Sequence, residues 1–101
     1  MNSAQLTQRC VAVADILKAL SNPDRLKLMC ALWDGEKTVG ELEAYAGISQ
    51  SMVSQFLHRL RLEGIVASRK AGNFVYYKIA DERVKVLVAS LYKIFCEGDA
   101  V

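Results

Sequence analysis

Short polar side chains gather on one side of the segment 49–63. When successive residues are placed 100° apart, Ser51, Ser54, Gln55 and His58 share that side. Groups of these types can reach base edges in the major groove of DNA: Gln can form two hydrogen bonds with adenine, Arg can do so with guanine, and Ser can bond several edges. We therefore predict that this side contacts bases. The candidate residues are Gln50, Ser51, Ser54, Gln55, His58 and Arg59.

A second polar group follows at 69–73. Arg69, Lys70 and Asn73 occupy a segment that could meet phosphates or the minor groove. The net charge of +2 does not by itself indicate nucleic-acid binding. Its distribution is more informative, because residues 49–83 carry six Lys/Arg against three Asp/Glu, whereas residues 1–48 carry five against six. This local excess suits a surface that faces phosphates.

A base-reading side chain needs a helix that is docked on the rest of the domain. Val53, Phe56, Leu57 and Leu60 form an apolar stripe opposite the polar side, which predicts an amphipathic helix. Ser49 is a suitable N-cap, so we expect the helix to run from there to Glu63, before the natural stop at Gly64.

The other elements are expected from apolar periodicity and turn residues. Helices are predicted over 4–20, from 22 to about 33, over 39–45 and from 81 onward, with strands at 65–70 and 74–79 joined by "AGN". This order describes a mainly α fold with a small β-hairpin, a winged helix-turn-helix. We expect a single DNA-binding domain over 1–101, in which the helices flanking the wing form a dimer.

Length and composition limit the class of protein. A chain of 101 residues forms one domain with a modest core. No apolar run approaches the roughly 18–20 residues of a membrane span, and "MNSAQLTQRC" lacks a secretory core, so we expect a cytoplasmic protein. Three widely spaced cysteines do not resemble a secreted disulfide framework and would be free thiols in a reducing compartment.

Three stretches together are similar to a known family. "LSNPDRLKLMCAL", "TVGELEAYAGISQSMVSQFLHRLRLEGIV" and "RKAGNFVYYKI" resemble the ArsR family of winged-helix bacterial repressors over roughly residues 10–96. Phe56 departs from the pattern, because many members carry His there. The resemblance implies a homodimer joined through the first and last helices, bound to double-stranded operator DNA with an inverted repeat. Binding would block RNA polymerase, and an inducer would release the protein.

The cysteines suggest which inducer. Cys30, Cys96 and "LYKIFC" resemble the persulfide- and sulfide-responsive branch of the family. This resemblance implies a redox-sensing pair for reactive sulfur species, in which one thiolate attacks an activated sulfur and the other resolves the product. Cys30 also shares a face with Leu26 and Met29, however, and a buried Cys often acts only as a small hydrophobe. Cys10 matches no sensing position and is interpreted as a structural or accessory thiol.

Other functions remain open at this stage. Family metal sites use a Cys-Val-Cys run, replaced here by Thr38, Val39 and Gly40, or His ligands on the last helix, which has none. We expect no metal and no cofactor, although three converging cysteines could bind a soft metal. A general redox sensor or a winged-helix protein-interaction module is also compatible with the sequence. Catalysis is not expected, since no nucleophile–base pair or phosphate loop is recognisable.

Overall fold

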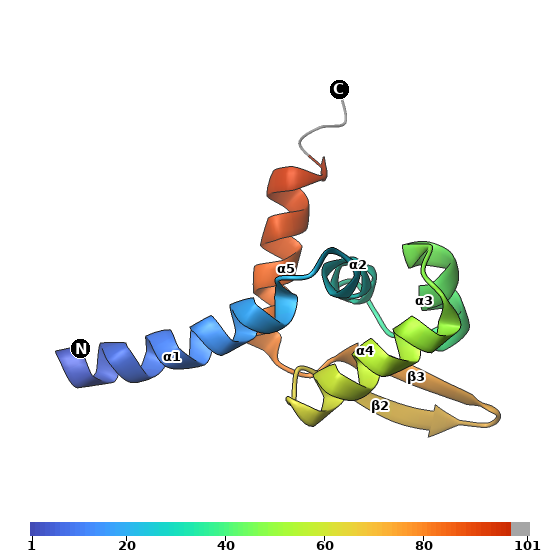
Figure 1. Ribbon diagram of the computed structural model, residues 1–101, viewed down its shortest axis with the longest axis horizontal. Coiled ribbons are helices and arrows are strands. Elements are labelled where there is room, and N and C mark those ends of the chain that lie inside the picture. The colour runs from blue at the N-terminus through green and yellow to red at the C-terminus, as the bar shows by residue number, and fades with distance from the viewer. Residues whose placement is uncertain (98–101) are drawn as a thin grey trace.

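The helices and strands follow one another in the predicted order. The computed structural model describes residues 1–97, which form five helices and a small antiparallel sheet (Figure 1). The helices are α1 (Ser3–Leu20), α2 (Pro23–Leu32), α3 (Val39–Ala46), α4 (Gln50–Leu62) and α5 (Glu82–Phe95). The strands are β1 (Lys37–Thr38), β2 (Val66–Ala71) and β3 (Phe74–Ile79). The mainly α, winged helix-turn-helix prediction is confirmed.

Local capping explains where the central helices begin and end. The Asn22 side chain accepts hydrogen bonds from two backbone N–H groups of α2, and Pro23 occupies the first turn, where its missing N–H costs nothing. Gly47 ends α3 at φ 68°, a conformation that favours glycine. Two residues later, the Ser49 hydroxyl accepts a hydrogen bond from the Met52 N–H at 3.2 Å and starts α4. The short link between these caps produces the helix-turn-helix.

One apolar core holds α2, α3, α4, α5 and the sheet together. Val53, Leu57 and Leu60 of α4 are completely buried in it, and Phe56 packs at its edge. The predicted docking stripe is therefore confirmed. Burial of each such side chain stabilises the fold by about 1.5–3 kcal/mol, so the stripe fixes how α4 is rotated. The other members of the core are Ala19, Leu20, Leu28, Met29, Ala31, Leu32, Leu42, Ala46, Ile65, Val66, Ile79, Val84 and Val88.

The sheet differs from the predicted two-stranded hairpin. It contains a third strand, β1, in the order β1-β3-β2, with Lys37 opposite Tyr77 and Thr38 opposite Tyr76. A two-residue strand has no periodicity of its own, so only the tertiary pairing defines it. The hairpin turn is also shorter than "AGN", because Ala71 already pairs with Phe74 and leaves Gly72 and Asn73 to form the turn.

Helix α1 extends away from the rest of the molecule and keeps much of its apolar stripe exposed (Figure 1). The exposed fractions are 50% for Leu6 and 49% for both Val13 and Leu17. A groove between α1 and α5 continues this surface, lined by Gln8, Arg9, Ala12, Val13, Ile16, Arg83, Val84 and Leu87. An exposed apolar surface of this extent is typical of an interaction site. In residues 1–97, no helix has the combination of length and apolarity that crossing a membrane requires.

Candidate nucleic-acid interface

Helix α4 separates its polar side from its buried side as the sequence predicts. All six candidate base contacts, Gln50, Ser51, Ser54, Gln55, His58 and Arg59, are exposed. The stripe formed by Val53, Leu57 and Leu60 has no exposed surface. The structure thus brings the six candidates together on one accessible side of one docked helix.

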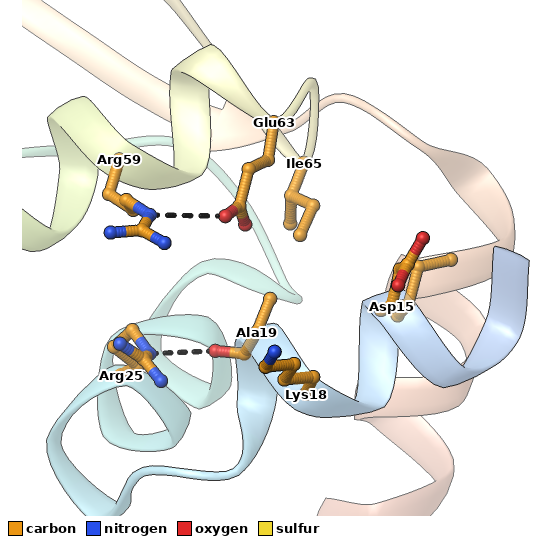
Figure 2. A pocket seen from close by; sticks show the side chains of 8 residues that line it. Asp15, Lys18, Ala19, Arg25, Arg59, Glu63 and Ile65 are labelled. Atoms are coloured by element: carbon orange, nitrogen blue, oxygen red, sulfur yellow. Dashed lines mark hydrogen bonds and ion pairs between the residues drawn. The ribbon is translucent and has the colours of Figure 1, made fainter. Parts of the chain in front are cut away.

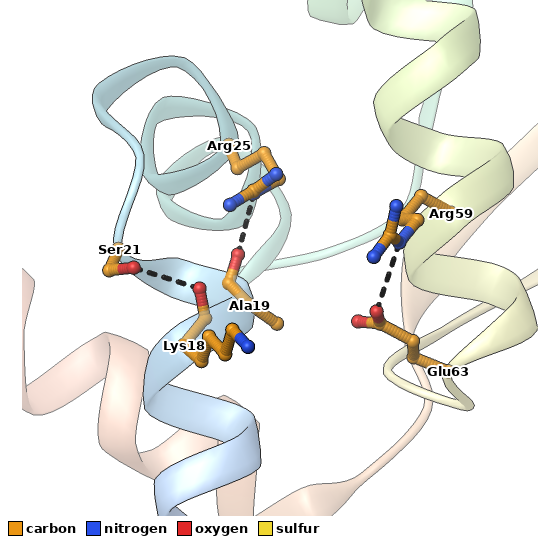
Figure 3. Close-up of polar contacts among 6 residues, drawn as sticks. All are labelled: Lys18, Ala19, Ser21, Arg25, Arg59 and Glu63. Carbon is orange, nitrogen blue, oxygen red and sulfur yellow. Dashed lines mark hydrogen bonds and ion pairs between the residues drawn. The ribbon is translucent and has the colours of Figure 1, made fainter.

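A cleft on one flank of α4 lies between this helix and residues of α1 and α2 (Figure 2). The Arg25 Nε donates to the Ala19 carbonyl oxygen at 2.7 Å, and its guanidinium lies 5.8 Å from the centre of the Phe56 ring. Across the cleft, the Arg59 Nε donates to a Glu63 carboxylate oxygen at 3.2 Å (Figure 3). Arg25 therefore contacts both the end of α1 and Phe56 of α4.

The wing presents Lys70 and Asn73 as exposed polar side chains near its turn. Arg69 is also exposed, but its guanidinium is already engaged. It donates to both carboxylate oxygens of Glu36, with Nε to Oε2 at 2.9 Å. These hydrogen bonds, with the charges of Arg69 and Lys78, hold the pKa of Glu36 below its ordinary value. Glu36 is therefore the carboxylate partner that holds Arg69 beside β1.

Aromatic rings extend this arrangement along one face of the wing. The Arg69 guanidinium lies 4.8 Å from the centre of the Tyr76 ring, directly across the strand pair. The Tyr76 and Phe74 rings follow, with their centres 6.5 Å apart. Sequence reasoning did not place Glu36, Phe74 and Tyr76 beside the candidate residues of the wing. The alternation of side chains along β3 places Phe74 and Tyr76 on one face, but the approach of Glu36 depends on β1.

Two of the three cysteines, Cys30 and Cys96, lie within electrostatic reach of each other. Cys30 is half-buried on α2, and Cys96 is exposed directly after α5. Burial raises the pKa of the Cys30 thiol, and the charge of Cys96 raises it further, so the two thiols are within electrostatic reach. All three cysteines are free thiols, and Cys10 is exposed on α1.

One aromatic residue, Tyr92 of α5, lies within electrostatic reach of both thiols. The Trp33 and Tyr92 rings have centres 5.8 Å apart and connect α5 to the end of α2. The charge of Tyr45, on α3, is the main cause that raises the pKa of Tyr92, and both thiols contribute in the same direction. Tyr92 is therefore within electrostatic reach of both thiols and of Tyr45 in α3, the first helix of the helix-turn-helix. Within residues 1–97, no three His, Cys, Asp or Glu side chains converge as a metal site would require.

Helices α3 and α4 form a helix-turn-helix, α4 exposes a polar side, and the β2–β3 hairpin follows as the wing. This is the arrangement of winged helix-turn-helix DNA-binding proteins. Residues 22–68 match the model of the family described as "Bacterial regulatory protein, arsR family". The chain belongs to the ArsR family of bacterial transcriptional regulators, which are not enzymes.

The similarity to individual members covers nearly the whole chain. The "Transcriptional activator HlyU" of Vibrio cholerae is 34% identical over 99 residues, which are 98% of this chain and 92% of that protein. The crystal structure of the transcriptional repressor BigR from Xylella fastidiosa is 43% identical, with a TM-score of 0.84 over 95% of this chain and 98% of that one. A homodimeric winged helix-turn-helix DNA-binding domain from Mycobacterium bovis is 31% identical, with a TM-score of 0.76 over 96% and 90%.

Proposed function

We propose that this protein is a homodimeric repressor that binds an inverted-repeat operator through the exposed side of α4. The observation that carries the proposal is the division of α4 between a buried apolar stripe and an exposed polar side. Gln50, Ser51, Ser54, Gln55 and His58 contact base edges. Arg59 belongs to the same set of base contacts. Lys70 and Asn73 contact phosphates or the minor groove.

The exposed surfaces of α1 and α5 support a two-fold dimer. Leu6, Val13 and Leu17 would lose contact with water when they pack on a second copy, which removes the cost of leaving this stripe exposed. The similar domain from Mycobacterium bovis is homodimeric. Two-fold symmetry places the recognition helices about one DNA turn apart, roughly 34 Å, and so requires an inverted repeat.

The regulatory direction is proposed to be repression, through exclusion of RNA polymerase from an overlapping promoter. The similarity to BigR, a repressor, supports this direction, whereas HlyU of Vibrio cholerae is named an activator. The two directions require the same DNA-binding surface and differ in where the operator lies relative to the promoter.

Oxidation of the Cys30 and Cys96 thiols is proposed to release the DNA. The exposed Cys96 thiolate attacks the outer sulfur of a hydropersulfide, RSSH, and expels RS⁻, which becomes RSH. The Cys30 thiolate then attacks the new Cys96 persulfide and expels hydrosulfide, leaving a disulfide between the two residues. Overall, two thiols and one RSSH give the disulfide, RSH and H₂S. A second RSSH gives the trisulfide, with two RSH and one H₂S.

A covalent bridge would act on DNA affinity through packing. Cys30 lies on α2, which packs against α3 and α5, and Cys96 follows α5. The bridge would favour one arrangement of these helices and change the separation of the two recognition helices in the dimer. A coupling of about 1–3 kcal/mol would lower the affinity for operator about 5- to 150-fold.

The test is fluorescence anisotropy with an inverted-repeat duplex selected from a random-sequence pool by the reduced protein. We expect the reduced protein to prefer this duplex over random DNA by about 10³-fold or more. Persulfide treatment should weaken binding in the wild type and in Cys10→Ser, the matched control, but not in Cys30→Ser or Cys96→Ser. Equal affinity before and after treatment would eliminate the switch. If the reduced protein binds the selected duplex no more tightly than random DNA, the proposal of an operator-specific repressor is wrong.

A further inference from the structure

The wing carries an exposed aromatic residue that its own fold does not need. Phe74 has 59% of its surface exposed, although it is the first residue of β3 and lies beside the turn at Gly72 and Asn73. Its cross-strand partner is Ala71, which is too small to cover the ring. The centre of its ring lies 6.5 Å from that of Tyr76. A large apolar side chain left this open is typical of a binding surface.

Phe74 is also held in a defined direction. Strand alternation places Phe74, Tyr76 and Arg69 on the same face of the wing, because Arg69 pairs with Tyr76 across the strands. Arg69 lies over the Tyr76 ring, and the Glu36 carboxylate accepts hydrogen bonds from the Nε and Nη2 groups of Arg69. Glu36 immediately precedes β1, so this chain of contacts anchors the face to the sheet. We call Phe74, Tyr76, Arg69 and Glu36 the wing ledge.

The chemistry around Phe74 identifies what it would contact. Lys70 and Asn73 are exposed next to the turn, and Lys78 is exposed on β3. The acid beside this face, Glu36, is already bound to Arg69. Strand alternation puts Lys78 on the same face as Phe74 and puts Lys70, opposite Val75, on the other face of the hairpin. The wing therefore offers an apolar ring together with cations on both of its faces, which matches DNA, in which apolar deoxyribose faces line the minor groove between rows of phosphates. Proteins that bind the minor groove frequently place apolar side chains, Phe among them, into that groove.

We propose that Phe74 packs against the deoxyribose walls of the minor groove beside each half-site. Arg69 is then a positioning residue for the ledge, and Lys70 supplies the phosphate contact. This inference rests on the proposed binding of an inverted-repeat operator. It adds a contact that depends on the shape of the flanking groove rather than on base hydrogen bonds.

Hydroxyl-radical footprinting tests the contact directly, because the radical attacks deoxyribose hydrogens exposed in the minor groove. The wild-type dimer should protect the minor groove outside each half-site. Phe74→Ala should lose that outer protection, keep the protection over the half-sites, and bind the selected duplex about tenfold more weakly. The slope of log K against log salt should stay unchanged, because no charge is removed.

Three variants serve as controls. Val75→Ala removes the neighbouring apolar residue, whose side chain points to the other face of the hairpin, and should leave the outer protection intact. Lys70→Ala should reduce the salt slope by about 1, through the loss of one phosphate contact. Phe74→Leu keeps an apolar group and should retain most of the affinity.

The outcomes separate this inference from the proposed function. A wild-type protein that protects half-sites, with Phe74→Ala giving the same outer protection and affinity, would overturn the ledge contact alone. A reduced salt slope in Phe74→Ala would also overturn it, because the ring would then merely position Lys70. A wild-type protein without any footprint would overturn the DNA-binding proposal itself.

Discussion

Replacing Gln55 by Ala separates the reading function of α4 from its structural role. The Gln55 side chain is exposed, so its loss should change the free energy of unfolding by less than about 0.5 kcal/mol. A two-bond contact with a base is worth about 1–3 kcal/mol of discrimination, which corresponds to about 5- to 150-fold in affinity. The variant should therefore melt like the wild type, bind the selected duplex more weakly, and tolerate substitutions at one position of each half-site.

Val53→Ala is the matched control on the buried side of the same helix. Val53 has no exposed surface, and removing two methyl groups costs about 1.6 kcal/mol in transfer free energy. The cavity left behind brings the loss to roughly 2–3 kcal/mol, or roughly 10–20 °C in the melting temperature of a domain this size. At 10 °C, where the variant is folded, its base preference should match that of the wild type.

The assay combines thermal denaturation at one fixed protein concentration with anisotropy titrations against a duplex set that varies one base pair at a time. A fixed concentration is needed because dimerisation contributes to the measured stability. Unchanged affinity and unchanged base preference in Gln55→Ala would refute the assignment of this side as the reading surface. A stability loss in Gln55→Ala comparable with that of Val53→Ala would refute the division of the helix into two sides.

Three further predictions concern the dimer, the wing and the thiols. Leu17→Glu should remain folded but sediment as a monomer, because it places a charge in the proposed dimer surface while disturbing little of the monomer core. Glu36→Gln should weaken outer footprint protection without steepening the salt slope; a tighter complex with a slope steeper by about 1 would show that Arg69 instead contacts phosphate. The rate of Cys30 alkylation should be lower than that of a free thiol at neutral pH and should increase with pH, because burial and the charge of Cys96 raise the Cys30 pKa. In Cys96→Ser, the midpoint of the curve of alkylation rate against pH should move to lower pH.

The structure of α4 could be predicted from sequence patterns that span only a few residues. The stripe of Val53, Leu57 and Leu60 repeats with the helical period, so the buried side and the exposed side of α4 follow from the sequence alone. The limits of α3 and α4 also follow from local chemistry, because Gly47 and Ser49 form caps with their immediate neighbours. These contacts involve residues at most a few positions apart.

The wing shows where local patterns fail. From the sequence, Arg69 is expected to be available to DNA. Its partner Glu36 is 33 residues away in the chain, and the pairing of β1 with β3 brings the two side chains together. The same applies to the thiols, since Cys30 lies on α2 and Cys96 directly follows α5, and these two helices are distant in the chain but packed together in the fold. The identity of each cation's or thiol's partner is therefore a property of the tertiary structure.

The sequence by itself determined the order of helices, the small β-hairpin, the side of α4 that stays in water and the concentration of positive charge near it. The tertiary structure decided that Arg69 is held by Glu36, that Phe74 is left open at the wing turn, and that Cys96 acts on the pKa of Cys30. The physical reason is one of range. Periodicity and capping depend on neighbours within one or two helical turns, whereas ion pairs, ring contacts and thiol coupling depend on distances that only chain folding sets.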